Sequence, residues 1–87
     1  MWRVEYSDLA EKDLLRLNKP ERERILKFFR ERVSSHPTPK SLAETLAGPL
    51  RGLWRFRIGD YRAICDIQEG KLVVLVLEVG HRGDVYR

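Results

Sequence analysis

Apolar residues recur along most of the chain, and the spacing at which they recur changes twice. Trp2, Val4 and Tyr6 alternate with polar residues, which predicts a short strand with one buried face. Ser7 has a side chain suited to the N-cap of a helix, which the spacing predicts from Asp8 to about Leu17. The chain is therefore expected to begin with a strand that leads directly into a helix.

A second helix is predicted after the break at residues 18–20. Pro20 suits the first turn of a helix, because its missing N–H would have no partner there. The apolar residues that follow at helical spacing are Ile25, Phe28, Phe29 and Val33. The other positions of this helix carry charges of both signs at three- and four-residue spacings, as a solvated face does.

From Gly52 onward the apolar pattern has a period of two. Short turn signals at residues 59–60 and 69–70 separate three runs, which are Leu53–Ile58, Tyr61–Ile67 and Leu72–Val79. The predicted order is one strand, two helices and a three-stranded antiparallel meander. This order indicates an α+β fold with the helices packed on one face of a mainly antiparallel sheet.

The composition indicates one domain over residues 1–87 with an anionic partner. The 17 Lys and Arg against 13 Asp and Glu give a net charge of +4, which favours nucleic acid or an acidic protein segment. Cys65 is the only cysteine, so no disulfide can form within the chain. The longest apolar stretch, Leu72–Leu77, is too short to cross a bilayer, and no signal peptide is recognisable. We therefore expect a cytoplasmic protein without a membrane segment.

A basic sheet face is predicted in the first run of the meander. Arg55 and Arg57 point to one side of a strand while Trp54 and Phe56 point to the other, because side chains alternate in direction. The side of Arg62 depends on the register of the following hairpin. Guanidinium groups gathered on one face suit the phosphate backbone of RNA. An arginine-covered strand that is simply solvated is the alternative interpretation.

The residues after the last strand are chemically the densest part of the chain. His81, Arg82 and Tyr86 lie within six residues of one another. Cleavage of RNA by its own 2′-hydroxyl needs a group that takes the proton, cations for the phosphorane charge and a donor for the leaving oxygen, and these side chains suit those roles. The sequence has no carboxylate pair and no His/Cys cluster at ligand spacing, so it predicts neither a metal nor a cofactor.

Two segments together resemble the RelE-type toxins of the RelE/ParE superfamily. These segments are residues 50–62, from Leu50-Arg51-Gly52 to Asp60-Tyr61-Arg62, and residues 79–86, from Val79-Gly80-His81-Arg82 to Val85-Tyr86. The predicted order of elements agrees over essentially the whole chain. The resemblance implies a toxin that enters the A site of the translating ribosome and cuts the mRNA there without a metal, leaving a cyclic phosphate.

The resemblance also assigns roles to residues of this chain. It implies that Arg55, Arg57 and Arg62 bind RNA, and that Arg62, His81, Arg82 and Tyr86 form the catalytic group. Arg55 and Arg57 stand where some relatives have lysine. Because arginine is effectively never deprotonated in a protein, the role of general base goes to His81 or Tyr86.

The expected partners are an acidic antitoxin, which forms a hetero-oligomer with the toxin, and the ribosome with mRNA in its A site. Two other functions are compatible with the same resemblance. One is a DNA gyrase inhibitor of the ParE branch, which the presence of Arg62, Arg82 and Tyr86 disfavours. The other is a non-catalytic remnant that only binds its antitoxin.

Overall fold

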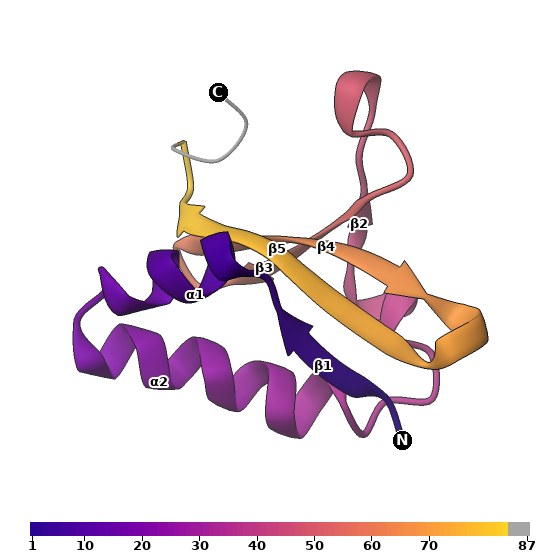
Figure 1. Ribbon diagram of the computed structural model, residues 1–87, viewed down its shortest axis with the longest axis horizontal. Helices are drawn as coiled ribbons and strands as arrows, with labels where there is room; N and C mark the ends of the chain where they lie inside the picture. Colours follow the sequence, from indigo (N-terminus) through magenta and orange to yellow (C-terminus); the bar gives the residue numbers. More distant parts are fainter. Residues whose placement is uncertain (84–87) are drawn as a thin grey trace.

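Two helical segments cover one face of a five-stranded mixed sheet in the computed structural model, which describes residues 1–83 (Figure 1). The strand order is β1-β5-β4-β3-β2. The predicted α+β fold, with helices on one face and a meander behind them, is confirmed. The sheet is mixed because β1 runs parallel to β5, whereas the pairs β5–β4, β4–β3 and β3–β2 are antiparallel.

The first strand and helix are joined through Ser7. Strand β1 (Arg3–Tyr6) precedes helix α1 (Asp8–Leu15), which ends two residues before the predicted boundary. The Ser7 hydroxyl accepts the N–H of Ala10 at 3.0 Å and so caps the helix, as predicted. The same hydroxyl donates to the carbonyl of Leu77 at 2.8 Å, which ties the start of α1 to strand β5.

The second helix supplies most of the apolar layer under the sheet. Helix α2 (Lys19–Lys27) continues as a π-helix, η1 (Phe28–Val33). The side chains of Ile25, Phe29 and Val33 are fully buried, as their spacing predicts. The Phe29 ring lies edge-on to Phe56 of β3 with centroids 5.4 Å apart, which fixes this helix against the meander.

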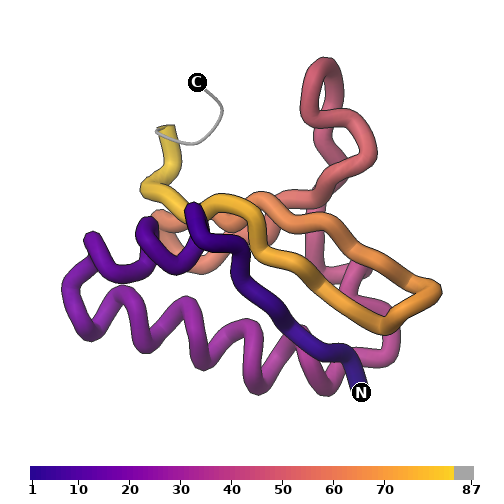
Figure 2. The backbone as a smooth tube through the Cα atoms, viewed as in Figure 1, coloured from indigo at the N-terminus to yellow at the C-terminus, as the bar shows by residue number. Residues whose placement is uncertain are grey.

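The predicted meander consists of β3 (Trp54–Ile58), β4 (Tyr61–Gln68) and β5 (Val73–His81). The segment that follows the second helix shows no clear period from Lys40 to Pro49, and it forms two short 3-10 helices, η2 (Pro39–Leu42) and η3 (Gly48–Leu50), on either side of strand β2 (Glu44–Thr45). A third 3-10 turn, η4 (Glu69–Lys71), joins β4 to β5. The chain between β2 and β3 rises from the sheet on the side away from the helices (Figure 2).

A bulge in the β4–β5 pairing decides which side chains of β5 face the helices. Cys65 pairs with Val76, whereas the preceding Ile64 pairs with Glu78, so Leu77 is the extra residue. Val76 is fully buried beneath the helices, and beyond the bulge it is Val79 that takes the buried position. Every later side chain of β5 therefore points to the face opposite to that expected from uninterrupted alternation.

Helix α1 replaces the missing neighbour of β5 beyond the end of β1. The carboxylate of Asp13 accepts the N–H of Val79 at 2.9 Å, and Ser7 satisfies the carbonyls of Val76 and Leu77. Strand β5 is thus hydrogen-bonded on both edges up to Val79, two residues before His81. Across residues 1–83, no helix has the length and apolar character needed to span a membrane.

Cys65 lies fully buried in the core of the sheet. Burial raises the pKa of its thiol well above the usual range, because the thiolate would lose its hydration. The same effect raises the pKa of the half-buried Tyr6 to about 12. Both groups are therefore neutral at physiological pH and act in packing.

Candidate functional site

The hairpin register brings three arginines to one face of the sheet. Arg57 pairs directly with Arg62 across β3 and β4, and directly paired residues share a face. Arg55 lies two residues before Arg57 and points the same way. Phe56, between them, is fully buried against the helices. We call Arg55, Arg57 and Arg62, on the side of the sheet away from the helices, the arginine face.

A carboxylate that the sequence reasoning missed lies on the arginine face. Glu44 of β2 pairs with Arg55 in register, and its carboxylate lies 3.0 Å from Arg55 Nε and 4.0 Å from Arg57 Nη1. All three side chains are partly exposed, so these ion pairs contribute at most about 1 kcal/mol to stability. Their main effect is to hold two guanidinium groups and one proton acceptor close together.

Arg62 differs from the other two arginines because it is buried. Only 8% of its surface is exposed, and its Nη1 donates to the carbonyls of Gly59 and Tyr61, both at 2.9 Å. Arg62 therefore holds the β3–β4 turn together from the arginine face. Its charge is fixed in position by these bonds.

We expect Arg62→Ala to lower the free energy of unfolding by about 1 to 3 kcal/mol, since it leaves two turn carbonyls without their donor. Arg57→Ala removes the same charge from an exposed neighbour on the same face and is expected to cost less than about 1 kcal/mol. Urea denaturation followed by circular dichroism measures both values. Equal losses for the two variants would show that Arg62 has no special structural role.

The backbone of Arg82 is anchored at the same turn. Its N–H donates to the carbonyl of Asp60 at 2.7 Å, directly after the end of β5. The turn at residues 59–60 thus organises both Arg62 and Arg82. Tyr86, the fourth predicted catalytic residue, lies outside the described residues.

His81 is placed on the other side of the sheet from the arginine face. It pairs with Tyr61, and their rings meet edge-on with centroids 5.5 Å apart. Both side chains line a pocket with Asp13 of α1 and with Arg16, which directly follows that helix, whereas it is Gly80 that lies beside Arg62. The structure therefore brings Arg55, Arg57 and Arg62 together but does not bring His81 to them.

The chemistry available on the arginine face is acid–base and electrostatic. Guanidinium groups can bind a phosphate and stabilise charge that develops on it, and a carboxylate such as Glu44 can accept a proton. No group of three His, Cys, Asp or Glu side chains that could hold a metal ion occurs within residues 1–83.

The fold and the arginine face define a small basic α+β domain, and comparison with known proteins shows its family. The model of the ParE toxin of the type II toxin–antitoxin system parDE matches residues 4–86. The chain therefore belongs to this family, within the RelE/ParE superfamily, and is a toxin of type II toxin–antitoxin systems. No curated protein matches the chain in sequence.

Solved structures with the same fold include complexes with antitoxins. The RelBE2 toxin–antitoxin complex from Mycobacterium tuberculosis matches with a TM-score of 0.86 and 26% identity, over 95% of this chain and 93% of that one. The archaeal RelE–RelB complex from Pyrococcus horikoshii matches with a TM-score of 0.72 and 30% identity, over 94% and 96%. The RelBE complex from Escherichia coli, at 22% identity and a TM-score of 0.73 over 93% and 96%, agrees in fold.

Proposed function

We propose that this toxin is a metal-independent endoribonuclease that cuts mRNA in the A site of the ribosome. The observation that carries the proposal is the arginine face, where Arg55, Arg57 and Arg62 lie with the Glu44 carboxylate among them. A phosphodiester in contact with these residues would have cations on its oxygens and a proton acceptor beside it.

The proposed reaction is attack of the 2′-oxygen on the adjacent phosphorus. The 2′-proton passes to a base, the bond to the 5′-oxygen of the next nucleotide breaks, and a cyclic phosphate and a 5′-hydroxyl are formed. Arg57, Arg62 and Arg82 stabilise the charge on the phosphorane. With the base placed elsewhere, we propose that Tyr86 provides the proton for the leaving oxygen, a role that a phenol can fill.

We assign the role of base to Glu44 in preference to His81. Glu44 lies in ion-pair contact with Arg55, one of the arginines that would bind the phosphate. The His81 ring lies on the opposite face and its Nδ1 is 2.9 Å from the carbonyl of Arg82. A phosphate that binds these guanidinium groups would bring its neighbouring 2′-hydroxyl close to the Glu44 carboxylate. His81 would have to cross the sheet to reach that hydroxyl.

We expect Arg82→Ala to lower the single-turnover rate of cleavage by about 10² to 10³-fold, as removal of one donor directed at developing charge commonly does. Binding to the ribosome should change much less, because Arg82 is one of 17 Lys and Arg residues in the chain. Quench-flow measurement with saturating protein separates the two quantities. A rate within threefold of wild type would exclude Arg82 from the transition state.

The partner expected in the cell is an acidic antitoxin. Related toxins have been solved as complexes with RelB, and the net charge of +4 suits an acidic chain. We propose that the antitoxin covers the arginine face or displaces the segment that carries Arg82 and Tyr86. In either case its binding to the toxin should weaken with salt and with charge reversal at Arg55 and Arg57.

The second candidate function is inhibition of DNA gyrase, because the family model is that of a ParE toxin. The two functions are separated by parallel assays on one preparation. Purified protein is added to a reconstituted translation reaction, in which mRNA ends are mapped, and to a gyrase supercoiling assay. Cleavage within codons without loss of supercoiling supports the proposal, and the reverse result supports the gyrase function.

A further inference from the structure

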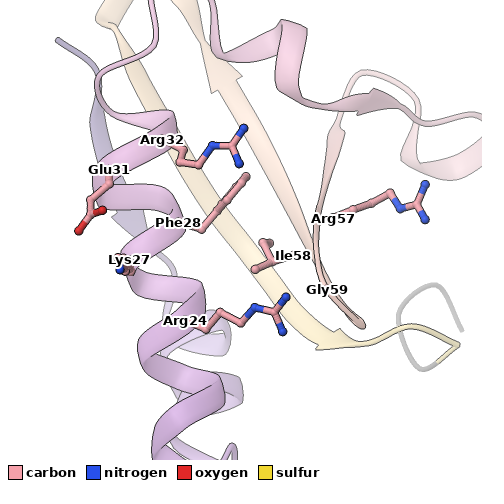
Figure 3. A pocket seen from close by; sticks show the side chains of 8 residues that line it. All are labelled: Arg24, Lys27, Phe28, Glu31, Arg32, Arg57, Ile58 and Gly59. Atoms are coloured by element: carbon pink, nitrogen blue, oxygen red, sulfur yellow. The ribbon is translucent and has the colours of Figure 1, made fainter.

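A second basic site lies on the helix side of the sheet, next to the β3–β4 turn. It is a pocket of about 290 Å³ between helix α2 with its continuation η1 and the end of β3. Figure 3 shows Arg24 and Arg32 pointing from the helix toward β3, with Phe28 and Ile58 between them. We call the pocket bounded by Arg24, Phe28, Arg32, Ile58 and Gly59 the basic pocket. Sequence patterning had indicated only a solvated helix face at Arg24 and Arg32.

Both guanidinium groups are held in place by contacts other than ion pairs. A Cβ built on Gly59 would lie 2.7 Å from Nη1 and Nη2 of Arg24, so this guanidinium rests on the bare backbone of the turn. Gly59 has φ +59°, a conformation that also favours glycine. The guanidinium of Arg32 lies 5.8 Å from the centroid of the Phe28 ring, within cation–π distance.

The basic pocket carries a clear excess of positive charge. Lys27 and Glu31 also line it, but Glu31 points away from β3 in Figure 3 and its carboxylate lies 3.7 Å from Arg30. Within residues 1–83, no carboxylate lies in ion-pair distance of Arg24 or Arg32. Each of these guanidinium groups can bind a phosphate through a pair of N–H donors, and the two lie beside one open cavity, with Phe28 and Ile58 between them.

Arg57 connects the basic pocket to the arginine face. It lines the pocket, yet in Figure 3 its guanidinium points away from α2, toward the other side of β3. Gly59 follows two residues later, a distance of about 6 to 7 Å along an extended strand. A polyanion that leaves the arginine face at Arg57 therefore meets Arg24 where its guanidinium rests on Gly59, the residue of the turn that has no side chain. This continuity favours an RNA chain as the occupant.

We infer that the basic pocket binds a backbone phosphate of the RNA that occupies the arginine face, outside the nucleotides that react. The inference rests on the proposed function for its ligand. Its role is positioning: Arg24 and Arg32 hold the chain after it passes the β3–β4 turn, and neither touches the reacting atoms. An acidic peptide in the same pocket is the competing outcome of the test.

The test uses the full-length protein and a fluorescent single-stranded RNA whose 2′-hydroxyls are methylated, so that it cannot be cut. Anisotropy titrations over a salt series from about 20 mM give the slope of log K against log salt, which changes by about 0.7 for each phosphate contact in single strands. We expect Arg24→Ala to weaken binding about threefold to tenfold and to lower the slope by about 0.7. Arg24→Lys, which keeps the charge, should restore most of the slope.

Arg30→Ala is the matched control, because it removes the same charge from the same helix on a side that lines a different pocket, with Trp2 and Tyr6. Equal slopes for the Arg24→Ala, Arg32→Ala and Arg30→Ala variants would overturn the inference. So would a wild-type protein that does not bind the RNA at the lowest salt, or variants that lose antitoxin binding alone. Because the RNA is not cleaved, loss of the proposed nuclease function in the translation assay would be seen separately from this result.

Discussion

Free protein is expected to cleave naked RNA at least about 10⁵-fold more slowly than mRNA in the A site of a translating ribosome. The arginine face offers cations and one carboxylate on a partly exposed sheet surface. Positioning of a nucleophile in line with its target can account for about 7 to 11 kcal/mol of a barrier. The ribosome must supply that positioning, and the protein supplies the charges.

The measurement compares single-turnover rates on one mRNA, free and programmed into ribosomes, at the same protein concentration. The Arg82→Ala variant serves as the control for contaminating ribonuclease, which would cleave at the same rate in both preparations. Similar wild-type rates with and without ribosomes would show that the protein alone positions the 2′-hydroxyl. The proposal that the ribosome supplies the positioning and the protein supplies the charges would then be wrong.

The second large effect is expected at Glu44. Glu44→Gln should lower the chemical step on the ribosome by about 10² to 10⁴-fold, the usual contribution of a general base. Glutamine has the same shape and can still accept hydrogen bonds from Arg55, so the arrangement of the arginine face is preserved. Single-turnover cleavage at saturating protein measures the loss, and thermal unfolding checks that the variant folds.

His81→Ala is the matched comparison, since it removes one of the two residues, His81 and Tyr86, that the sequence left as candidates for the base. Because His81 lies on the opposite face of the sheet, its substitution by alanine is expected to change the cleavage rate by less than about threefold. Tyr86→Phe is the third variant in this comparison. It removes the phenolic hydroxyl but keeps the ring, so it tests whether the hydroxyl itself is needed. A large loss in His81→Ala together with a small one in Glu44→Gln would return the role of base to His81.

The faces of the sheet on which Glu44 and His81 lie could not be predicted from the sequence. The alternation of apolar residues predicts the strands of the meander, and β3 is indeed split into a buried aromatic face and an arginine face. In β5, however, the extra residue Leu77 inverts the alternation. His81 therefore points to the helix side, and no local pattern in a run of Leu and Val marks that bulge.

The position of Glu44 could not be predicted from the sequence for a different reason. It belongs to a two-residue strand in a segment without hydrophobic period, and its position depends on pairing with β3, eleven residues further along the chain. Arg62 was an intermediate case, since its residue type suggested phosphate binding but its face depended on the hairpin register. Periodicity specifies elements and their buried faces, whereas register and bulges arise only when the whole sheet is assembled.

The most direct test of the central claim is cleavage of an mRNA that carries a single 2′-deoxynucleotide at the position cut in the A site. The proposed reaction uses that 2′-oxygen as its nucleophile, so we expect no cut at this position, while the all-ribose mRNA is cut in parallel and its upstream fragment ends in a 2′,3′-cyclic phosphate. Cleavage of the deoxy-substituted mRNA at the same position and rate would show that the 2′-oxygen is not the nucleophile.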